Sequence, residues 1–206
     1  MIGVIAGDVI GSVHEHALTK RTDFALFDPR CRFTDDTVLT VATAYAILNG
    51  TPYATAYRDF GREHPNAGYG RSFYEWLLGD ELRPYHSWGN GSAMRVAPVG
   101  FAFNNVEDVL LEAARSAAVT HNHLEGIKGA QATALAVFMA RADASKDEIR
   151  EEIMQRFGPS GSPCRSAVMP IPKPQSRAAL LRRSIDGSLT RSSLASESGC
   201  LHDSTK

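Results

Sequence analysis

The chain has 206 residues, enough for one folded domain and hardly enough for two. Hydrophobic residues make up 43% and charged residues 22%, and the formal net charge is −1, so neither nucleic acid nor a membrane is an expected partner. The widely separated Cys31, Cys164 and Cys200 argue against a disulfide framework and a cysteine-rich zinc site. No apolar run approaches the roughly 18 residues that span a bilayer, and the N-terminal run lacks the basic start of a signal peptide. We therefore expect a cytoplasmic protein.

Residues 1–157 are predicted to form helices separated by loops with glycine or proline, because no segment keeps up the alternation of apolar and polar residues typical of a strand. The first helix is expected over 2–18, where Gly3, Gly7 and Gly11 form a face small enough for close packing on a neighbour. The other helices are expected over 36–49, 53–63, 71–79, 106–118, 124–141 and 145–157. The predicted fold class is all-α, a compact orthogonal multi-helix domain.

Local signals mark several helix ends. Asn49-Gly50 is expected to end the helix 36–49, and Ser145 followed by Glu148 predicts a capping box before the last helix. Apolar residues at helical spacing support two of the helices: Val38, Val41, Ala42, Tyr45 and Leu48 in one, and Phe73, Trp76 and Leu77 in the other.

The composition changes near Gly158. Residues 158–206 hold 11 of the 17 serines and half of the 10 prolines, with 7 basic and 3 acidic residues and no Phe, Tyr or Trp. Such a segment buries too little apolar area to offset the conformational entropy that folding removes. We expect a helical domain at 1–157 and a largely irregular, mostly disordered tail at 158–206, with at best a short helix around 178–183.

The segment Thr34-Asp35-Asp36-Thr37 has two interpretations. Thr34 or Asp35 suits the N-cap of the helix that follows, and acidic residues suit its first turn. Two adjacent carboxylates beside a hydroxyl also suit Mg²⁺ or Mn²⁺, which prefer oxygen ligands, and do not suit zinc. Taken alone, the segment favours the helix cap.

Asp8 and Glu15 are seven residues apart, so on a helix over 2–18 both carboxylates lie on the same face, on either side of Gly11. A carboxylate among small apolar residues costs free energy unless it is paired or bound to a metal. The alternative is that Glu15 is solvated at the helix end, beside His14 and His16.

Two loop segments are candidates for ligand contacts. His86-Ser87-Trp88 leads into Gly89-Asn90-Gly91-Ser92-Ala93-Met94-Arg95, a glycine-rich turn whose N–H groups suit phosphate oxygens, although no Gly-Lys-Ser/Thr follows to indicate nucleoside triphosphate binding. Thr120-His121-Asn122-His123 precedes the helix 124–141, and its two histidines point different ways, which argues against a shared zinc. A lone loop histidine is more often solvated than bound to a ligand.

The residues of these segments, and the order of the segments along the chain, resemble those of the ADP-ribosylglycohydrolase family, including its dinitrogenase-reductase-activating type. The resemblance runs through residues 6–12 with Glu15, then 33–37, 89–95 and 120–126, and covers 1–157. It implies an all-α protein with two Mg²⁺ or Mn²⁺ ions that cleaves the bond linking ADP-ribose to a protein side chain or a small molecule.

The resemblance also implies roles for individual residues. Thr34, Asp35 and Asp36 match the first group of metal ligands, and Glu15 matches a glutamate at the metal centre that serves as the catalytic acid or base. His121 matches a contact on the ribose side. The loop that holds the diphosphate would consist of Ser87, Trp88, Gly89, Asn90, Gly91 and Ser92.

The chain departs from this family near its C-terminus, where members carry an Asp-x-Asp-Thr motif that completes the two-metal site. The nearest candidates here are Asp186 and Asp203-Ser204-Thr205, and neither gives two aspartates at i and i+2. We expect the family's C-terminal third to be missing or replaced, by a frameshift or in a naturally shortened homologue, and the second metal site to be incomplete. The alternative function is therefore a non-catalytic remnant that binds ADP-ribose or a protein partner.

Overall fold

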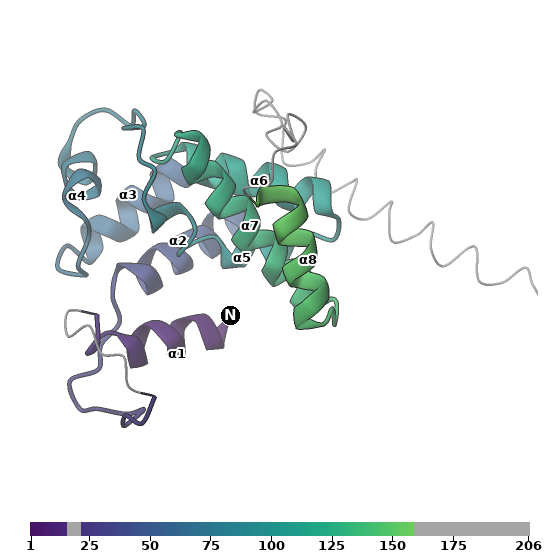
Figure 1. Ribbon diagram of the computed structural model, residues 1–206. Helices are drawn as coiled ribbons and strands as arrows, with labels where there is room; N and C mark the ends of the chain where they lie inside the picture. Colours follow the sequence, from purple (N-terminus) through teal and green to yellow (C-terminus); the bar gives the residue numbers. More distant parts are fainter. Residues whose placement is uncertain (16–21, 159–206) are drawn as a thin grey trace, which may run out of the picture. The chain divides into compact units, whose positions relative to one another are not determined.

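The structure, a computed structural model, describes residues 1–15 and 22–158. Within these residues it contains helices and no strand, which confirms the all-α class (Figure 1). The predicted tail after Gly158, with its short helix at 178–183, lies outside the described residues. The elements are α1 (Ile2–Gly11), α2 (Asp35–Asn49), α3 (Tyr53–Glu63), α4 (Arg71–Leu78), the 3₁₀ turn η1 (Asn90–Ser92), α5 (Ala97–Ala102), α6 (Val106–Ala118), α7 (Leu124–Arg141) and α8 (Lys146–Phe157).

The helix ends follow the local signals in the sequence. Thr34 is the N-cap of α2, and its side chain accepts a hydrogen bond from the Asp36 amide. Gly50 ends α2 in the left-handed conformation, with φ of 67°, which glycine adopts without strain. Ser145 and Glu148 form both hydrogen bonds of the predicted capping box before α8.

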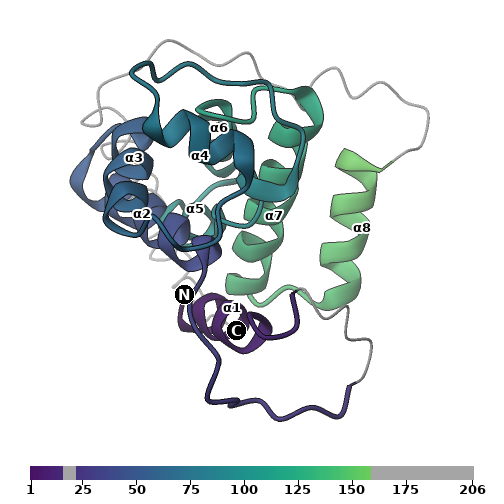
Figure 2. The same ribbon diagram turned by 90° about the vertical axis from the view of Figure 1, so that its left-hand side faces the viewer.

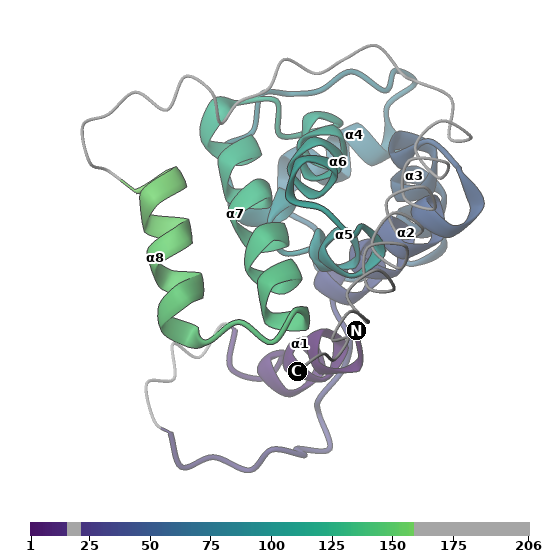
Figure 3. The same ribbon diagram turned by 90° about the vertical axis from the view of Figure 1, so that its right-hand side faces the viewer.

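Two hydrophobic clusters hold the helices together. The first joins α5, α6 and α7 through small and β-branched residues such as Val99, Ala113 and Ala130. Gly100 permits close contact there, because a Cβ at this position would lie 2.6 Å from the carbonyl oxygen of Ala134 in α7. Figure 3 shows α5 and α6 on one side of α7 and α8 on the other, in agreement with the helix contacts.

The second cluster joins α2, α3 and α4 around Leu39, Tyr57 and the predicted apolar face of α4, which is buried. Only some of the apolar residues whose spacing predicted α2 are buried. Val41, Tyr45 and Leu48 are exposed, whereas the buried face consists of Val38, Leu39, Thr40, Ala42, Thr43 and Ala46. The spacing identified the helix correctly but did not identify the face that packs on α3.

The N-terminal helix is shorter than predicted. It ends at Gly11, and residues 12–15 form turns, so Asp8 and Glu15 do not share one helix face. The helix contacts α2 (Figure 2), but none of its residues is buried. A Cβ at Gly3, Gly7 or Gly11 would meet nothing within 4 Å, so the small-residue face has no close neighbour among the described residues.

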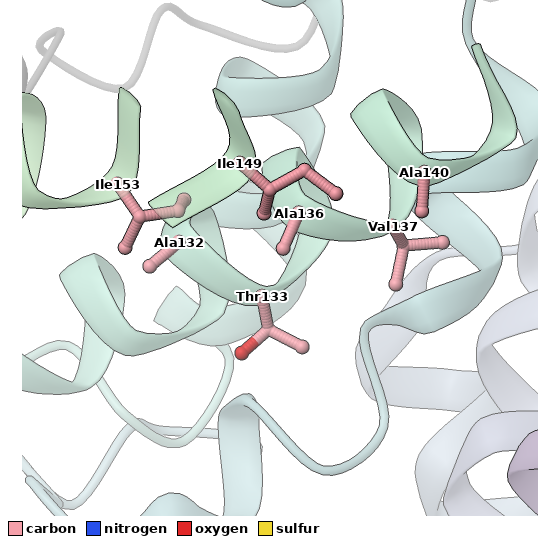
Figure 4. A pocket seen from close by; sticks show the side chains of 7 residues that line it. All are labelled: Ala132, Thr133, Ala136, Val137, Ala140, Ile149 and Ile153. Atoms are coloured by element: carbon pink, nitrogen blue, oxygen red, sulfur yellow. The ribbon is translucent and has the colours of Figure 1, made fainter. Parts of the chain in front are cut away.

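An apolar groove lies between α7 and α8 and has a volume of about 530 Å³. Figure 4 shows Ile149 and Ile153 of α8 facing α7 across this groove. Its remaining lining consists of Ala132, Thr133, Ala136, Val137 and Ala140. None of these residues belongs to the predicted metal or ligand site. No helix among the described residues is both long enough and apolar enough to span a bilayer.

Candidate functional site

The first turn of α2 is held by the carboxylate of Asp8, a role that the sequence did not indicate. Asp8 Oδ1 accepts a hydrogen bond from Thr34 Oγ1 at 2.6 Å, and Oδ2 accepts from the amides of Thr34 at 2.8 Å and Thr37 at 3.2 Å. The Thr37 hydroxyl donates a further hydrogen bond to Oδ2. Asp8 therefore satisfies backbone N–H groups that a helix start leaves without a partner.

The Asp35 and Asp36 side chains do not cap α2. The Asp35 amide donates to the carbonyl of Ala67 at 2.9 Å, and the Asp36 amide donates to the Thr34 hydroxyl at 3.3 Å. Capping is thus performed by Thr34 and Asp8, so the interpretation as a helix cap is correct for Thr34. The Asp35 and Asp36 carboxylates remain available as oxygen ligands.

Asp35 and Asp36 are half-buried and lie among other acidic groups. Burial, with the like charge of Asp36, raises the pKa of Asp35 to about 6. Burial and the charges of Asp8 and Glu15 also raise the pKa of Asp36. Within the described residues, no Lys or Arg forms an ion pair with either carboxylate. The first turn of α2 therefore concentrates negative charge that a bound cation would neutralise.

The donor set fits a hydrated divalent cation in its chemistry. Mg²⁺ is commonly held by one or two carboxylates and keeps several waters as its other ligands. Among residues 1–15 and 22–158, no group of three or more His, Cys, Asp or Glu side chains is arranged to hold a metal ion. Asp35 and Asp36 alone would thus supply two of the ligands that such an ion needs, and Glu15 is an exposed acidic neighbour after α1.

A turn that the sequence interpretation overlooked borders Asp35. Gly68 has φ of 103°, and a Cβ there would lie 3.8 Å from Asp35 Oδ1. The next residue, Tyr69, has a pKa raised by burial and by the charge of Asp35. Its hydroxyl is buried and has no hydrogen-bond partner among the described residues. The only sequence signal for this turn was the pair of glycines around Tyr69.

The two predicted ligand loops are bonded to each other. The His86 amide donates to Asn122 Oδ1 at 2.8 Å, and the Ser87 amide donates to the Thr120 carbonyl at 3.3 Å. Ser92 Oγ donates to the Gly126 carbonyl at 2.7 Å. The loops at 86–92 and 120–126 therefore form one unit, although they are separated by about 30 residues of chain.

Within this unit the predicted contacts differ in exposure. Trp88 is 75% exposed, and Gly89 and Asn90 are also exposed, so a ligand can reach them. Ser87 and Gly91 are half-buried. Ser92 is fully buried, so its hydroxyl supports the loop from inside.

His121 is buried, with 5% of its surface exposed, and is not the solvated loop histidine that its position suggested. Burial and the nearby charge of Arg95 lower the pKa of His121 to about 4. A Cβ at Gly91 would lie 3.0 Å from both Cε1 and Nε2 of His121. The imidazole therefore packs directly against the glycine-rich turn.

Helix α2 connects the acidic cluster to the ligand loops. Thr40, one turn after Asp36, donates from its hydroxyl to the Met94 carbonyl at 3.4 Å, just after η1. Asp36 and Thr40 are four residues apart, which is about 6 Å along the axis of α2. The structure thus gathers Asp8, Glu15 and the first turn of α2 in one group and the two loops in a second, with α2 between them.

Comparisons with known proteins identify one family of relatives. The family model of the ADP-ribosylglycohydrolases matches residues 1–200, which extends beyond residue 157, where the resemblance in the motifs ends. The chain is 29% identical to ADP-ribosylhydrolase ARH3 of Mus musculus over 183 residues, covering 72% of this chain and 50% of that protein. It is 28% identical to the Homo sapiens ARH3, with the same coverage, and 27% identical to the Gallus gallus ARH3, covering 76% and 53%. The chain spans about half the length of these curated relatives.

Proposed function

The chain belongs to the ADP-ribosylglycohydrolase family, and from this premise we propose that it hydrolyses ADP-ribosyl linkages at a metal site built on the first turn of α2. The observation that carries the proposal is the pair of half-buried carboxylates, Asp35 and Asp36, that no cation among the described residues neutralises. Capping does not account for them, because Thr34 and Asp8 already serve that purpose. The substrate would be an ADP-ribosylated protein or a small ADP-ribose adduct.

In this proposal, Thr34, Asp35 and Asp36 would hold a Mg²⁺ or Mn²⁺ ion. The ion would supply orientation of the ribose hydroxyls and would make the attacking water more acidic. Glu15 is exposed, and its charge contributes to the raised pKa of both aspartates, which supports our assignment of Glu15 as the group that accepts or returns a proton near them. The carboxylates also favour a ribose that carries positive charge in the transition state.

The loop unit provides the substrate side of the site. In the turn from Ser87 to Gly91, the N–H groups of Ser87 and Gly89 already donate within the loops, so those of Trp88, Asn90 and Gly91 would face a diphosphate. Trp88 also offers a large exposed aromatic surface. His121 stays neutral at physiological pH and packs against this turn, so it suits a polar contact with the ribose. A cytoplasmic location, which the sparse cysteines favour, is part of the same proposal.

A second candidate function is non-catalytic binding of ADP-ribose or a protein partner. It is favoured by the absence, among the described residues, of a third carboxylate or histidine that completes the metal site. Binding through the loop unit alone requires no metal. The two candidates therefore differ in how ADP-ribose binding depends on Mg²⁺.

Calorimetric titration of the full chain with ADP-ribose, with and without Mg²⁺, separates the two candidate functions. An assay for ADP-ribose release from ADP-ribosylated arginine and serine peptides then measures turnover. Hydrolysis requires Mg²⁺-dependent binding and turnover that Asp35→Asn abolishes. A matched control is Asp147→Asn, since Asp147 occupies the first turn of α8 as Asp35 occupies that of α2, but is exposed. Mg²⁺-independent binding without turnover would support the second candidate. No binding of ADP-ribose at all would contradict both hydrolysis and non-catalytic binding of ADP-ribose.

A further inference from the structure

Arg95, which follows η1, is a buried cation that forms no ion pair within residues 1–15 and 22–158. Its side chain is completely buried, and its guanidinium carbon lies 4.1 Å from the centre of the Tyr57 ring. Nη2 donates to the Ser116 carbonyl at 3.1 Å and to Thr120 Oγ1 at 2.8 Å. Nε and Nη1 have no hydrogen-bond partner among the described residues. Burying a guanidinium in this way costs free energy, which the two hydrogen bonds of Nη2 and the contact with Tyr57 offset in part.

The Thr120 hydroxyl is the point at which Arg95 reaches the ligand loops. A hydroxyl has one proton to donate and two lone pairs that accept. Arg95 can only donate, so it occupies one lone pair of Thr120 Oγ1. The hydroxyl is buried, and Arg95 and His121 are its hydrogen-bond partners among the described residues.

The single proton of Thr120 is then left for one acceptor. His121 Nδ1 lies 2.8 Å from Thr120 Oγ1, and an imidazole nitrogen without a proton accepts hydrogen bonds well. If Nδ1 carried the proton instead, it would occupy the second lone pair of Thr120 Oγ1, and the buried hydroxyl proton would have no acceptor among the described residues, which costs free energy. The bonding around this hydroxyl therefore favours the arrangement in which Thr120 donates to Nδ1.

We infer that Arg95 and Thr120 are positioning residues that hold His121 in the tautomer with an unprotonated Nδ1 and a proton on Nε2. The far edge of the ring, Cε1 and Nε2, borders Gly91 in the glycine-rich turn. His121 accordingly presents an N–H donor at this turn, which selects an oxygen acceptor such as a ribose hydroxyl or a phosphate oxygen. The nature of that acceptor rests on the proposed function, whereas the tautomer does not.

Two further observations support a single neutral tautomer. The lowered pKa of His121, due to burial and to the Arg95 charge, keeps the ring neutral well below physiological pH. The Tyr57 hydroxyl is bonded to Thr43 in α2 and to Ser116 in α6, which fixes the ring against which Arg95 lies. The guanidinium, and with it the hydroxyl of Thr120, is thus anchored to the core of the protein.

The test is ¹⁵N NMR of the full chain with labelled histidine, with the His121 signals assigned from His121→Gln. We expect the wild-type ring to show an unprotonated Nδ1 and a protonated Nε2. Thr120→Ser keeps the hydroxyl and should keep this tautomer, whereas the nearly isosteric Thr120→Val should shift the ring toward a mixture. A protonated Nδ1 in the wild type, or an unchanged tautomer in folded Thr120→Val, would overturn the inference. If Thr120→Val does not fold, the wild-type spectrum and Thr120→Ser decide it.

A parallel ADP-ribose titration separates this inference from the proposed function. Thr120→Val should weaken binding about tenfold, roughly the worth of one hydrogen bond, and Thr120→Ser should restore it. A wild-type chain with the expected tautomer but no affinity for ADP-ribose would contradict the proposed function and leave the tautomer assignment standing. Unchanged affinity in Thr120→Val would show that the ligand does not depend on the Nε2 donor.

Discussion

Replacing Asp8 tests whether α1 organises the acidic site through the start of α2. Its carboxylate accepts four hydrogen bonds, from both the amide and the hydroxyl of Thr34 and of Thr37. A hydrogen bond to a charged group contributes about 1.5–3 kcal/mol, and loss of a helix cap costs about 1 kcal/mol. The four bonds share one carboxylate and are half-exposed, so water replaces part of them. We expect Asp8→Ala to lower the free energy of unfolding by about 3 kcal/mol.

Asp8→Asn refines this prediction, because the amide keeps the shape of the side chain and one acceptor oxygen. That oxygen can still accept from the amides of Thr34 and Thr37, so the expected loss is about 1 kcal/mol. Removing the charge should also lower the pKa of Asp35 and Asp36, since Asp8 is among the groups that raise both.

The assay is urea unfolding followed by circular dichroism at neutral pH in metal-free buffer. Asp59→Ala, an exposed aspartate within α3, serves as the control and should change stability by no more than about 0.5 kcal/mol. An Asp8→Ala variant as stable as the control would refute the role of Asp8 as the anchor of α2. Equal losses for Asp8→Ala and Asp8→Asn would show that charge, and not the number of acceptors, sets the effect.

Two further predictions concern packing and pH. Gly100→Ala should lower the free energy of unfolding by about 1–3 kcal/mol in thermal unfolding, because the added Cβ would lie 2.6 Å from the backbone oxygen of Ala134. Gly129→Ala in α7, where the added Cβ has room, should raise it by up to about 1 kcal/mol. The same effect from both variants would contradict the packing of α5 on α7. His121 has a folded pKa of about 4 against an ordinary 6.5, so the unfolded chain binds its proton first and stability should fall as pH drops from about 6.5 to 4, by at most about 1.4 kcal/mol per pH unit. His121→Gln should flatten this part of the stability profile measured by urea unfolding, and an unchanged slope would show that His121 is not buried as described.

The helices could be predicted from the sequence because their signals are local. Spacing, caps and glycine at helix ends located α2, α3, α4, α6, α7 and α8 to within one or two residues. Helix α5 was missed because Ala97–Ala102 has six residues, too few to show a period, and contains Pro98. The first helix was overextended because the chain after Gly11 keeps residues that a helix tolerates.

For the site, the sequence predicted which types of residue take part but not how they contact one another. The acidic first turn of α2 and the two loops were visible as motifs, but the contacts that give them their properties connect distant parts of the chain. Asp8 bonds residues 26 and 29 positions away, and Arg95 bonds Thr120, 25 positions away. Without those contacts, the sequence predicts that Asp8 and Glu15 share one helix face, and the loop position of His121 favours a solvated side chain. Burial and hydrogen bonding of this kind follow from the tertiary structure alone.

The most direct measurement of the central claim is titration of Mn²⁺ into the full chain, followed by electron paramagnetic resonance of the free ion. If Asp35 and Asp36 form a cation site, the wild type and Asp147→Asn should bind Mn²⁺ equally, and Asp35→Asn should weaken binding at least about tenfold, which corresponds to about 1.4 kcal/mol. Mg²⁺ should displace the bound Mn²⁺. Mn²⁺ binding that is absent in the wild type, or unaffected by Asp35→Asn, would contradict the assignment of a metal site to the first turn of α2.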